Sequence, residues 1–167
     1  DRVLKSMNRK GGTAIIKDAV ARLRKAIPHI SIRTTLITGY PGETEEEFNE
    51  LYEFVKETKF ERLGAFEYSR EEGTPAYDMP KQVSAATKKK RCEAIMSDQN
   101  RIHNDFNAKF INKTLTVICE GYDQVSECFF GRSYADAPDI DGKVYFTAPK
   151  RIKTGEFVSV KITEVLD

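Results

Sequence analysis

The apolar positions of the chain change their period at about residue 110, and this change predicts two domains. Before that point, apolar residues follow the spacing of one helix face or form a continuous run. Beyond it they alternate with polar residues, which is the period of a strand. We therefore expect an α/β domain over residues 1–110, including a long connecting helix, and an all-β domain over residues 111–167.

The centre of the predicted α/β domain is a strand, a tight turn and a helix. Residues 30–38 are mostly β-branched or apolar, and only Arg33 is charged, so they predict a largely buried strand. The sequence GYPG at residues 39–42 forces a turn, because glycine permits a positive φ and proline fixes its own φ. Thr44 and Glu47 then have the spacing of a capping box, which predicts the start of a helix. This succession is the repeating unit of parallel α/β proteins.

Further elements are predicted on both sides of this unit. Helical spacing predicts helices over residues 1–9, 13–27 and 84–110, and a second strand is predicted at residues 63–69. The two strands have the separation that is usual for a βαβ unit. Two strands cannot close a parallel barrel, so we expect a fragment of a larger α/β barrel. Its free strand edges would make the fragment self-associate or leave it partly mobile.

Short alternating segments predict the second domain. Alternation is clear at residues 115–120, 144–147 and 158–165. Turn residues separate these segments, for example the Asp-Gly pair at residues 141–142. Roughly four or five short strands without a helix are typical of a small antiparallel barrel.

Composition excludes several classes of protein. Hydrophobic residues make up 40% of the chain and charged residues 32%, as in soluble globular proteins, and no apolar run reaches the ~20 residues needed to span a bilayer. Cys92, Cys119 and Cys128 are too few and too scattered for a disulfide framework or a zinc site, so we expect a cytoplasmic protein. The net charge of +1 gives no strong indication of nucleic-acid binding.

Three motifs, in this order, resemble the radical S-adenosylmethionine methylthiotransferases. The sequences MNRKG at residues 7–11, RTTLITGYPGETEEEF at residues 33–48 and FEYSREEGTPAYDMP at residues 66–80 are similar to the last third of that family's catalytic barrel. The segment after residue 110 resembles its TRAM domain, a five-stranded OB-like barrel. Within it, GRSYADAPDIDGKVYF at residues 131–146 resembles the branch that modifies a ribosomal protein, in contrast to the branch that modifies transfer RNA.

The resemblance implies an open, TIM-like barrel and the chemistry of the family. A CxxxCxxC motif there holds a 4Fe–4S cluster that cleaves S-adenosylmethionine, the resulting radical removes a hydrogen from carbon, and a second 4Fe–4S cluster helps to deliver sulfur. In the ribosomal branch the target is the β-carbon of an aspartate in small-subunit protein S-twelve. Neither cysteine set is present in this sequence. We therefore expect a C-terminal fragment of a transferase that binds no cluster and is inactive by itself.

The carboxyl ends of the two predicted strands are the candidate cofactor site. Ile37, Thr38 and Gly39 match the position at which family members approach the adenine of S-adenosylmethionine, and Tyr68 and Ser69 end the next strand. Active sites at this end of the strands are the rule for α/β barrels. The alternative is that Gly39 only makes the turn. No catalytic residue and no metal ligand is predicted.

An acidic segment supplies the candidate substrate-binding residues. Residues 120–142 contain six acidic residues and one basic residue. We assign docking of a basic small-subunit ribosomal protein to Arg132, Tyr134, Asp136, Asp139 and Asp141, because an acidic surface attracts a cationic partner.

Three other interpretations stay open. The barrel could bind RNA, as in the transfer-RNA branch, but RNA-binding barrels normally have basic grooves with exposed aromatic residues, so this is the weaker alternative. The acidic surface could have no partner, or the fragment could have only a structural role. The basic run at residues 88–91 either contacts RNA or forms a solvated helix face.

Overall fold

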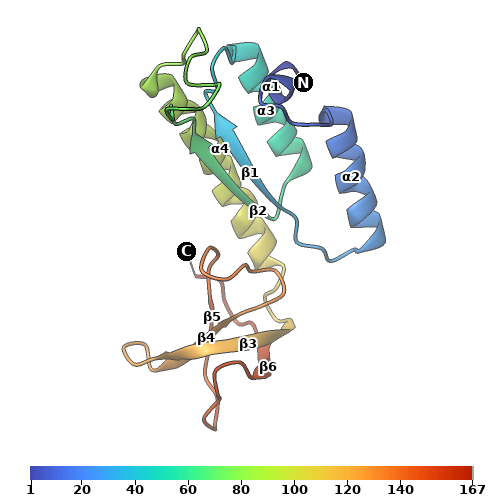
Figure 1. The fold of residues 1–167 in the computed structure, drawn as a ribbon. Helices are drawn as coiled ribbons and strands as arrows, with labels where there is room; N and C mark the ends of the chain where they lie inside the picture. The colour runs from blue at the N-terminus through green and yellow to red at the C-terminus, as the bar shows by residue number, and fades with distance from the viewer. Residues whose placement is uncertain (167) are drawn as a thin grey trace. The chain divides into compact units, whose positions relative to one another are not determined.

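A computed structural model describes residues 1–166 of the chain (Figure 1). The chain forms two compact units, Asp1–His103 and Asn104–Asp167. The division falls within the last helix, whereas the change in sequence pattern lies at residue 110. Each unit is described by itself.

The first unit contains a parallel two-stranded sheet with helices. The elements are α1 (Arg2–Ser6), α2 (Thr13–Ala26), β1 (Arg33–Thr38), α3 (Glu45–Thr58), β2 (Arg62–Glu67) and α4 (Ala85–Ala108). The register of β1 and β2 runs from Arg33 opposite Arg62 to Thr38 opposite Glu67. The predicted strand–turn–helix–strand succession is therefore confirmed, with strand ends shifted by up to three residues.

Helix α3 begins at a capping box and ends at a residue in the left-handed conformation. The side chain of Thr44 accepts a hydrogen bond from the Glu47 amide, and the Glu47 carboxylate accepts one from the Thr44 amide at 3.0 Å. This is the predicted capping box. At the other end, Lys59 adopts a left-handed conformation with φ of 50°, and its amide donates to the carbonyl of Val55.

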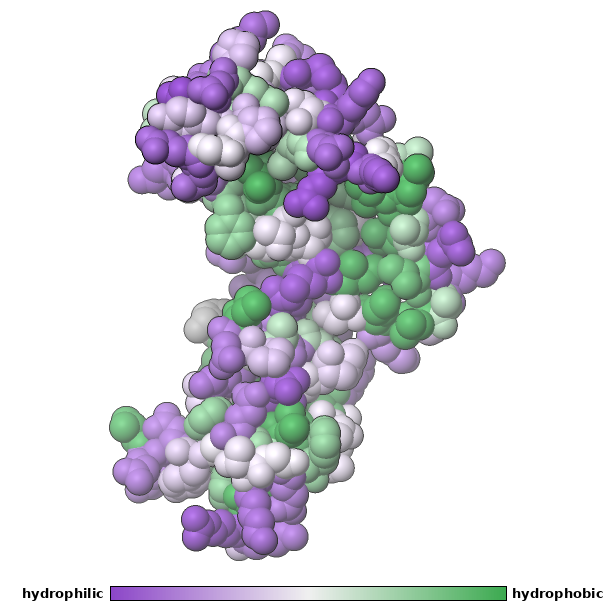
Figure 2. All heavy atoms as spheres, viewed as in Figure 1, coloured by the Kyte–Doolittle hydropathy of each residue, from purple (hydrophilic) through white to green (hydrophobic). Residues whose placement is uncertain are grey.

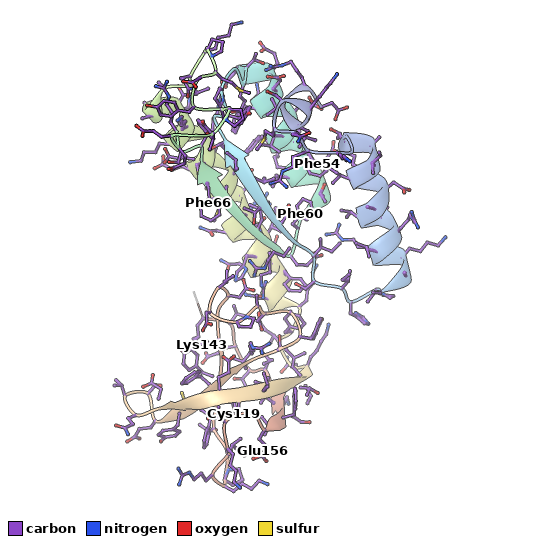
Figure 3. All side chains as sticks on the ribbon, viewed as in Figure 1. Phe54, Phe60, Phe66, Cys119, Lys143 and Glu156 are labelled. Carbon is purple, nitrogen blue, oxygen red and sulfur yellow. The ribbon has the colours of Figure 1, made fainter. Side chains whose placement is uncertain are left out.

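Helices α3 and α4 cover one face of the sheet. Their side chains form the core of this unit together with residues of both strands and of the turn before β2. Its buried members are Phe48, Val55, Phe60, Leu63 and Ile95. Thr38 on β1 also points to this side and is fully buried. On the other face, Ile37 is 37% exposed and its partner Phe66 is 61% exposed. Figure 3 labels Phe66 on β2.

Helix α2 has no buried residue, although its sequence is amphipathic. Its apolar side chains Ile16 and Val20 instead line an apolar hollow of about 610 Å³ beside β1, together with Leu51 and Phe54 of α3. Figure 2 shows the apolar side chains gathered in this part of the first unit. Part of the apolar surface of this unit is therefore uncovered.

The second unit is a curled antiparallel sheet of four strands (Figure 1). The strands are β3 (Thr114–Asp123), β4 (Cys128–Arg132), β5 (Val144–Phe146) and β6 (Phe157–Lys161), in the spatial order β5-β4-β3-β6. Strand β4 was absent from the sequence-based prediction, and β6 ends at Lys161, whereas its alternation was predicted to continue to residue 165.

Side chains from all four strands and one loop residue pack inside the curled sheet. The buried core consists of Val117, Cys119, Phe129, Phe146, Ile152 and Val160. Gly131 of β4 has to be glycine, because a Cβ there would lie 2.1 Å from the carbonyl oxygen of Ile118. Among the described residues, no helix is both long enough and apolar enough to cross a membrane.

Candidate functional site: the strand ends of the first unit and two charged surfaces of the second

The backbone of the turn after β1 has positive φ values at the two glycines, as the sequence predicts. Gly39 and Gly42 have φ values of 74° and 79°, in the region that favours glycine. A Cβ on Gly39 would also lie 2.4 Å from Cγ of Lys88. The close approach of α4 is therefore a second reason, besides the positive φ, for glycine at this position. The turn is closed by Glu43, whose Oε1 accepts a hydrogen bond of 2.9 Å from the Gly39 amide.

A buried arginine fixes the start of α3 against α4. The guanidinium of Arg91 contacts Oε1 of Glu43 at 2.6 Å and Oε2 of Glu45 at 2.8 Å. The side chains of Arg91 and Glu43 are 7% and 4% exposed. The interpretation of residues 88–91 as a uniform solvated face was therefore wrong for Arg91. Its spacing to the buried residues Ile95 and Gln99 is the sequence signal that places it on the inner helix face.

Lys88 of the same run also points inward. Its Nζ donates a 2.8 Å hydrogen bond to the carbonyl of Tyr68 and lies 4.8 Å from the centre of the Tyr68 ring. Its backbone carbonyl lies 3.3 Å from the hydroxyl of Thr38. Helix α4 thus holds the ends of both strands, while Lys89 and Lys90 are exposed.

The structure brings the five predicted cofactor-site residues to one edge of the sheet. The Tyr68 amide donates to the Thr38 carbonyl at 2.9 Å, which extends the pairing beyond both strands. The Ile37 side chain lies on the open face, whereas that of Thr38 points into the helix layer. Ser69 is exposed and bonds to Glu71.

The Tyr68 ring packs against Tyr40, with ring centres 5.5 Å apart at an interplanar angle of 72°. Its hydroxyl is buried and has no hydrogen-bond partner among the described residues. Burial raises the pKa of the Tyr68 hydroxyl, and Tyr40 adds to the shift. The hydroxyl therefore stays protonated and suits a structural role better than acid–base work at neutral pH.

Of the strand-end residues, Ile37 exposes an apolar side chain on the open face, whereas Gly39 is buried and its amide donates to Glu43. The three cysteines are dispersed: Cys92 bonds to the carbonyl of Ala65, Cys119 is buried in the core of the second unit, and Cys128 lies on β4. Burial raises the pKa of Cys92 and disfavours the thiolate that a cluster needs. Within residues 1–166 no group of three potential metal ligands occurs.

The carboxylates of the acidic segment mostly bond within their own loop. Asp136 accepts hydrogen bonds from the amide and hydroxyl of Ser133 at 3.0 and 2.6 Å, and Asp141 accepts one from the Ala137 amide at 2.7 Å. Arg132 pairs with Glu120 at 2.8 Å. These groups hold the loop in shape.

Two of the predicted docking residues project outward. Asp139 is exposed and has a φ of 61°, and Tyr134 is 59% exposed with its ring 6.4 Å from that of Phe110. The acidic segment therefore presents Asp139 and Tyr134 to solvent, with Glu127 exposed at the preceding turn. Any partner docking on this segment would meet these side chains first.

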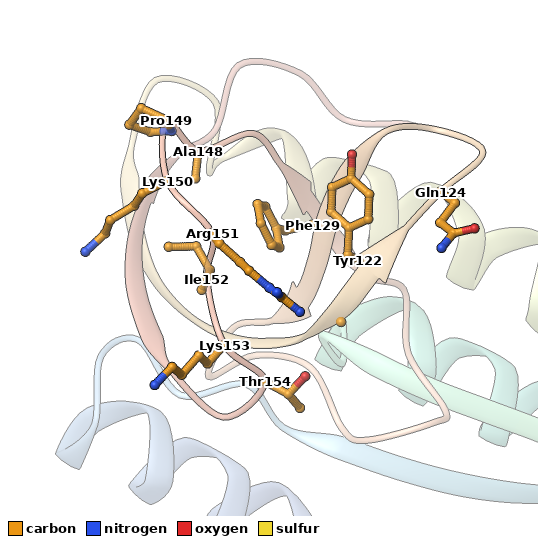
Figure 4. A pocket seen from close by; sticks show the side chains of 11 residues that line it. Tyr122, Gln124, Phe129, Ala148, Pro149, Lys150, Arg151, Ile152, Lys153 and Thr154 are labelled. Carbon is orange, nitrogen blue, oxygen red and sulfur yellow. The ribbon is translucent and has the colours of Figure 1, made fainter.

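A basic surface on the second unit was absent from the sequence-based prediction. Residues 143–161 contain five basic residues and one acidic residue. Part of this segment, residues 148–154, lines an open groove of about 990 Å³ opposite Tyr122 and Gln124 (Figure 4). The reversal of charge after residue 142 is the sequence signal that could have revealed it.

Comparison with known proteins assigns the two units to described families. Residues 1–55 match the model of the radical SAM superfamily, and residues 111–167 match that of the TRAM domain. Over its full length the chain is 48% identical to ribosomal protein uS12 methylthiotransferase RimO of Clostridium botulinum (strain Eklund 17B) and 44% identical to the protein of the same name from Acetivibrio thermocellus. The protein of that name from Geobacter sulfurreducens is 48% identical over 168 aligned residues. The chain spans 37% of the length of each of these relatives.

Proposed function

We propose that the chain belongs to the radical S-adenosylmethionine methylthiotransferase family and is part of a cytoplasmic enzyme that methylthiolates an aspartate β-carbon in ribosomal protein uS12. It contributes the C-terminal part of an open, TIM-like radical barrel and an OB-like TRAM barrel. The uncovered face of β1 and the apolar hollow beside α2 support this proposal, because the preceding strands of a larger barrel would cover both. The fragment by itself has no activity, since its cysteines do not fit a cluster.

The S-adenosylmethionine of the complete enzyme lies at the edge formed by Ile37, Thr38, Gly39, Tyr68 and Ser69. When bound with its cluster, it supplies the radical that removes hydrogen from the substrate. The two 4Fe–4S clusters are held by other parts of the complete protein. In this chain, Ile37 offers an apolar contact to the adenine, and Glu43 fixes the buried Gly39 turn that follows the strand.

The second unit docks the protein substrate. The observation that carries this part is the acidic segment, residues 120–142, with six carboxylates to one basic side chain. Its field attracts a basic ribosomal protein, and the exposed Asp139 and Tyr134 contact it directly. Arg132, Asp136 and Asp141 take part by shaping the loop. The alternative, an RNA-binding module of a transfer-RNA methylthiotransferase, receives no support from the relatives above, which carry the name of the uS12 enzyme.

The docking proposal is tested by neutralising exposed carboxylates only. Asp136 and Asp141 are unsuitable, because their substitution would disturb the loop itself. The variant Asp139→Asn with Glu127→Gln leaves these bonds intact. Binding of uS12, measured by titration calorimetry at low and at physiological salt, should weaken about two- to tenfold at low salt and become less salt-dependent.

The matched control is Glu72→Gln with Asp78→Asn, which removes the same charge from an exposed loop of the first unit. It should bind uS12 like the unmodified chain. Equal binding by the chain and both variants would refute a docking role for the acidic segment. Tight, salt-sensitive binding of a transfer-RNA anticodon stem without binding of uS12 would favour the alternative.

A further inference from the structure

The loop between β4 and β5 exposes two large apolar side chains among its carboxylates. Tyr134 is 59% exposed and Ile140 is 73% exposed. Both belong to residues 133–143, which also contain Asp136, Asp139 and Asp141. Single exposed apolar residues are common on protein surfaces. These two become informative only because the loop holds each of them in a fixed position.

The backbone around Tyr134 is fixed by its two neighbours. Ser133 and Ala135 are each 5% exposed, so the exposed tyrosine stands between two buried residues. The Ser133 hydroxyl donates to Asp136 at 2.6 Å and accepts a hydrogen bond of 3.2 Å from the Ala135 amide. The Asp136 amide donates to the Ser133 carbonyl at 3.3 Å. A partner therefore does not have to order this part of the loop when it binds.

The ring of Tyr134 is supported by two further rings of the same unit. It stands edge-on to Phe110, with centres 6.4 Å apart at 86°. Phe110 in turn stands edge-on to Phe106, with centres 5.1 Å apart at 86°, and both phenylalanines are half-buried. Tyrosine has few side-chain torsions, so a ring supported in this way loses little entropy when a second apolar group packs on its exposed side.

Ile140 lies in a second closed turn of the same loop. The Asp141 carboxylate accepts a hydrogen bond of 2.7 Å from the Ala137 amide, and the Asp141 amide donates to the Ala137 carbonyl at 3.5 Å. Between these residues, Pro138 restricts its own φ and Asp139 has a φ of 61°. The turn therefore holds Ile140 at the surface with most of its side chain in water.

The carboxylates of this loop have a different capacity for direct contacts. Those of Asp136 and Asp141 bond to groups of the loop itself and have fewer acceptor positions for a partner. Ion pairs between exposed groups contribute little affinity, whereas the burial of an apolar side chain contributes more. The negative field therefore accelerates the encounter with a basic protein, and the apolar side chains stabilise the complex after it has formed.

We propose that Tyr134 and Ile140 are the apolar anchors of the docking site and determine which basic surface it accepts. The partner is a protein surface on which an apolar side chain lies between lysine or arginine residues. A few apolar and aromatic residues with a charged rim are the usual arrangement of a binding hot spot. This inference rests on the proposed docking of uS12 and adds the contacts that hold the complex together, with Ile140 as a further residue of the site.

Titration calorimetry of the 167-residue chain with uS12 tests the anchors. The variants Ile140→Ser and Tyr134→Ser should each weaken binding about tenfold or more, because each loses an apolar side chain that the complex buries. The loss should be the same at low and at physiological salt. Measured over several temperatures, the heat-capacity change of binding should become less negative in both variants, which is the signature of lost apolar burial.

The matched control is Ile15→Ser, the same substitution at a residue of α2 that is 66% exposed. It should bind uS12 like the unmodified chain. Ile140→Leu, which keeps the apolar area, should also bind almost normally. Far-UV circular dichroism and thermal melting check that each variant is folded, and the exposure of Tyr134 and Ile140 predicts little change in stability.

Poly-lysine, a polycation without large apolar groups, separates recognition from attraction. It should bind weakly and equally to the unmodified chain and to Ile140→Ser. If Ile140→Ser loses poly-lysine and uS12 binding to the same extent, Ile140 only shapes the acidic loop and the inference is wrong. The inference also fails, with the docking proposal intact, if both anchor variants bind uS12 like Ile15→Ser while the Asp139 variant binds weakly. Absence of uS12 binding by the unmodified chain overturns both.

Discussion

Replacing Arg91 by methionine should destabilise the first unit strongly, because it leaves a buried carboxylate without its partner. Glu43 is 4% exposed at its side chain and contacts Arg91 at 2.6 Å. It also accepts a hydrogen bond from the amide of Gly39, so the carboxylate cannot move to solvent without breaking this bond and opening the turn. Glu45, the second partner of Arg91, is 65% exposed. Its carboxylate stays hydrated when Arg91 is removed, so the loss of this ion pair costs little stability.

The expected magnitude follows from the burial of the pair. Removing one partner of a buried ion pair costs about 3–5 kcal/mol, whereas replacing both partners by neutral residues is often close to neutral. Arg91→Met should therefore lower the free energy of unfolding by about 3–5 kcal/mol. The double variant Arg91→Met, Glu43→Gln should recover about half or more of this loss, because glutamine can still accept the Gly39 amide without a buried charge.

Urea unfolding measures both variants. The chain contains no tryptophan, so the helical circular dichroism signal is the appropriate probe, and it reports on the first unit, where the helices lie. With a slope of about 1.5 kcal/mol per molar urea, Arg91→Met should lower the midpoint by about 2 M or more. A loss below about 1 kcal/mol, or a double variant as unstable as the single one, would refute the assignment of Arg91 and Glu43 as a buried pair.

Three further predictions concern pH, metal and assembly. The hydrogen bond from Arg2 holds the pKa of Glu47 at about 2, below its ordinary value of 4.5, so its stabilisation is complete above pH 4.5 and is lost as the pH falls towards 2. Glu47→Gln, which keeps the capping interaction, should cost about 1–2 kcal/mol at pH 7 after allowance for solvent screening, and this cost should shrink steadily below pH 4.5 and vanish below pH 2, as checked by urea unfolding. Anaerobic reconstitution of the chain should yield background iron and sulfide, and a stoichiometric cluster absorption band would contradict this. In sedimentation the isolated chain should self-associate or, if monomeric, exchange the amides of residues 33–38 rapidly, and a monomer with strongly protected β1 amides would count against an open barrel edge.

Sequence reasoning succeeded where structure is determined by neighbours in the chain. The capping box at Thr44, the glycine turn at Gly39 and the strand before it depend on contacts over a few residues, and all three are present. The roles of Arg91 and Lys88 depend on partners more than 15 residues away, Glu43 and Tyr68, and the charge run hid them.

Strand β4 was absent from the prediction for another local reason. Phe129 and Phe130 are consecutive aromatic residues, so they break the alternation that marks a strand. In the sheet, Phe129 is buried in the core, whereas the ring of Phe130 lies on the opposite face under the ammonium group of Lys143, 4.2 Å from its centre. A cation over an aromatic ring lets an apolar side chain occupy the outer face of a strand, and the pattern of apolar residues cannot distinguish it from a core position.

The charges of the second unit show why counting residues gives an incomplete description of a binding surface. The acidic segment outnumbers the basic loop in charged residues, yet Asp123, Asp136 and Asp141 each accept hydrogen bonds from their own loops. A carboxylate committed in this way still contributes to the long-range field, which steers a basic protein towards the surface, but it has fewer acceptor positions for direct contacts. Residues 148–154 are the reverse case, with three cations that have no ion-pair partner within the described chain. The committed carboxylates should therefore act mainly on the rate at which a basic protein reaches the surface, whereas Asp139, which is exposed, should affect both the association and the dissociation rate of that complex.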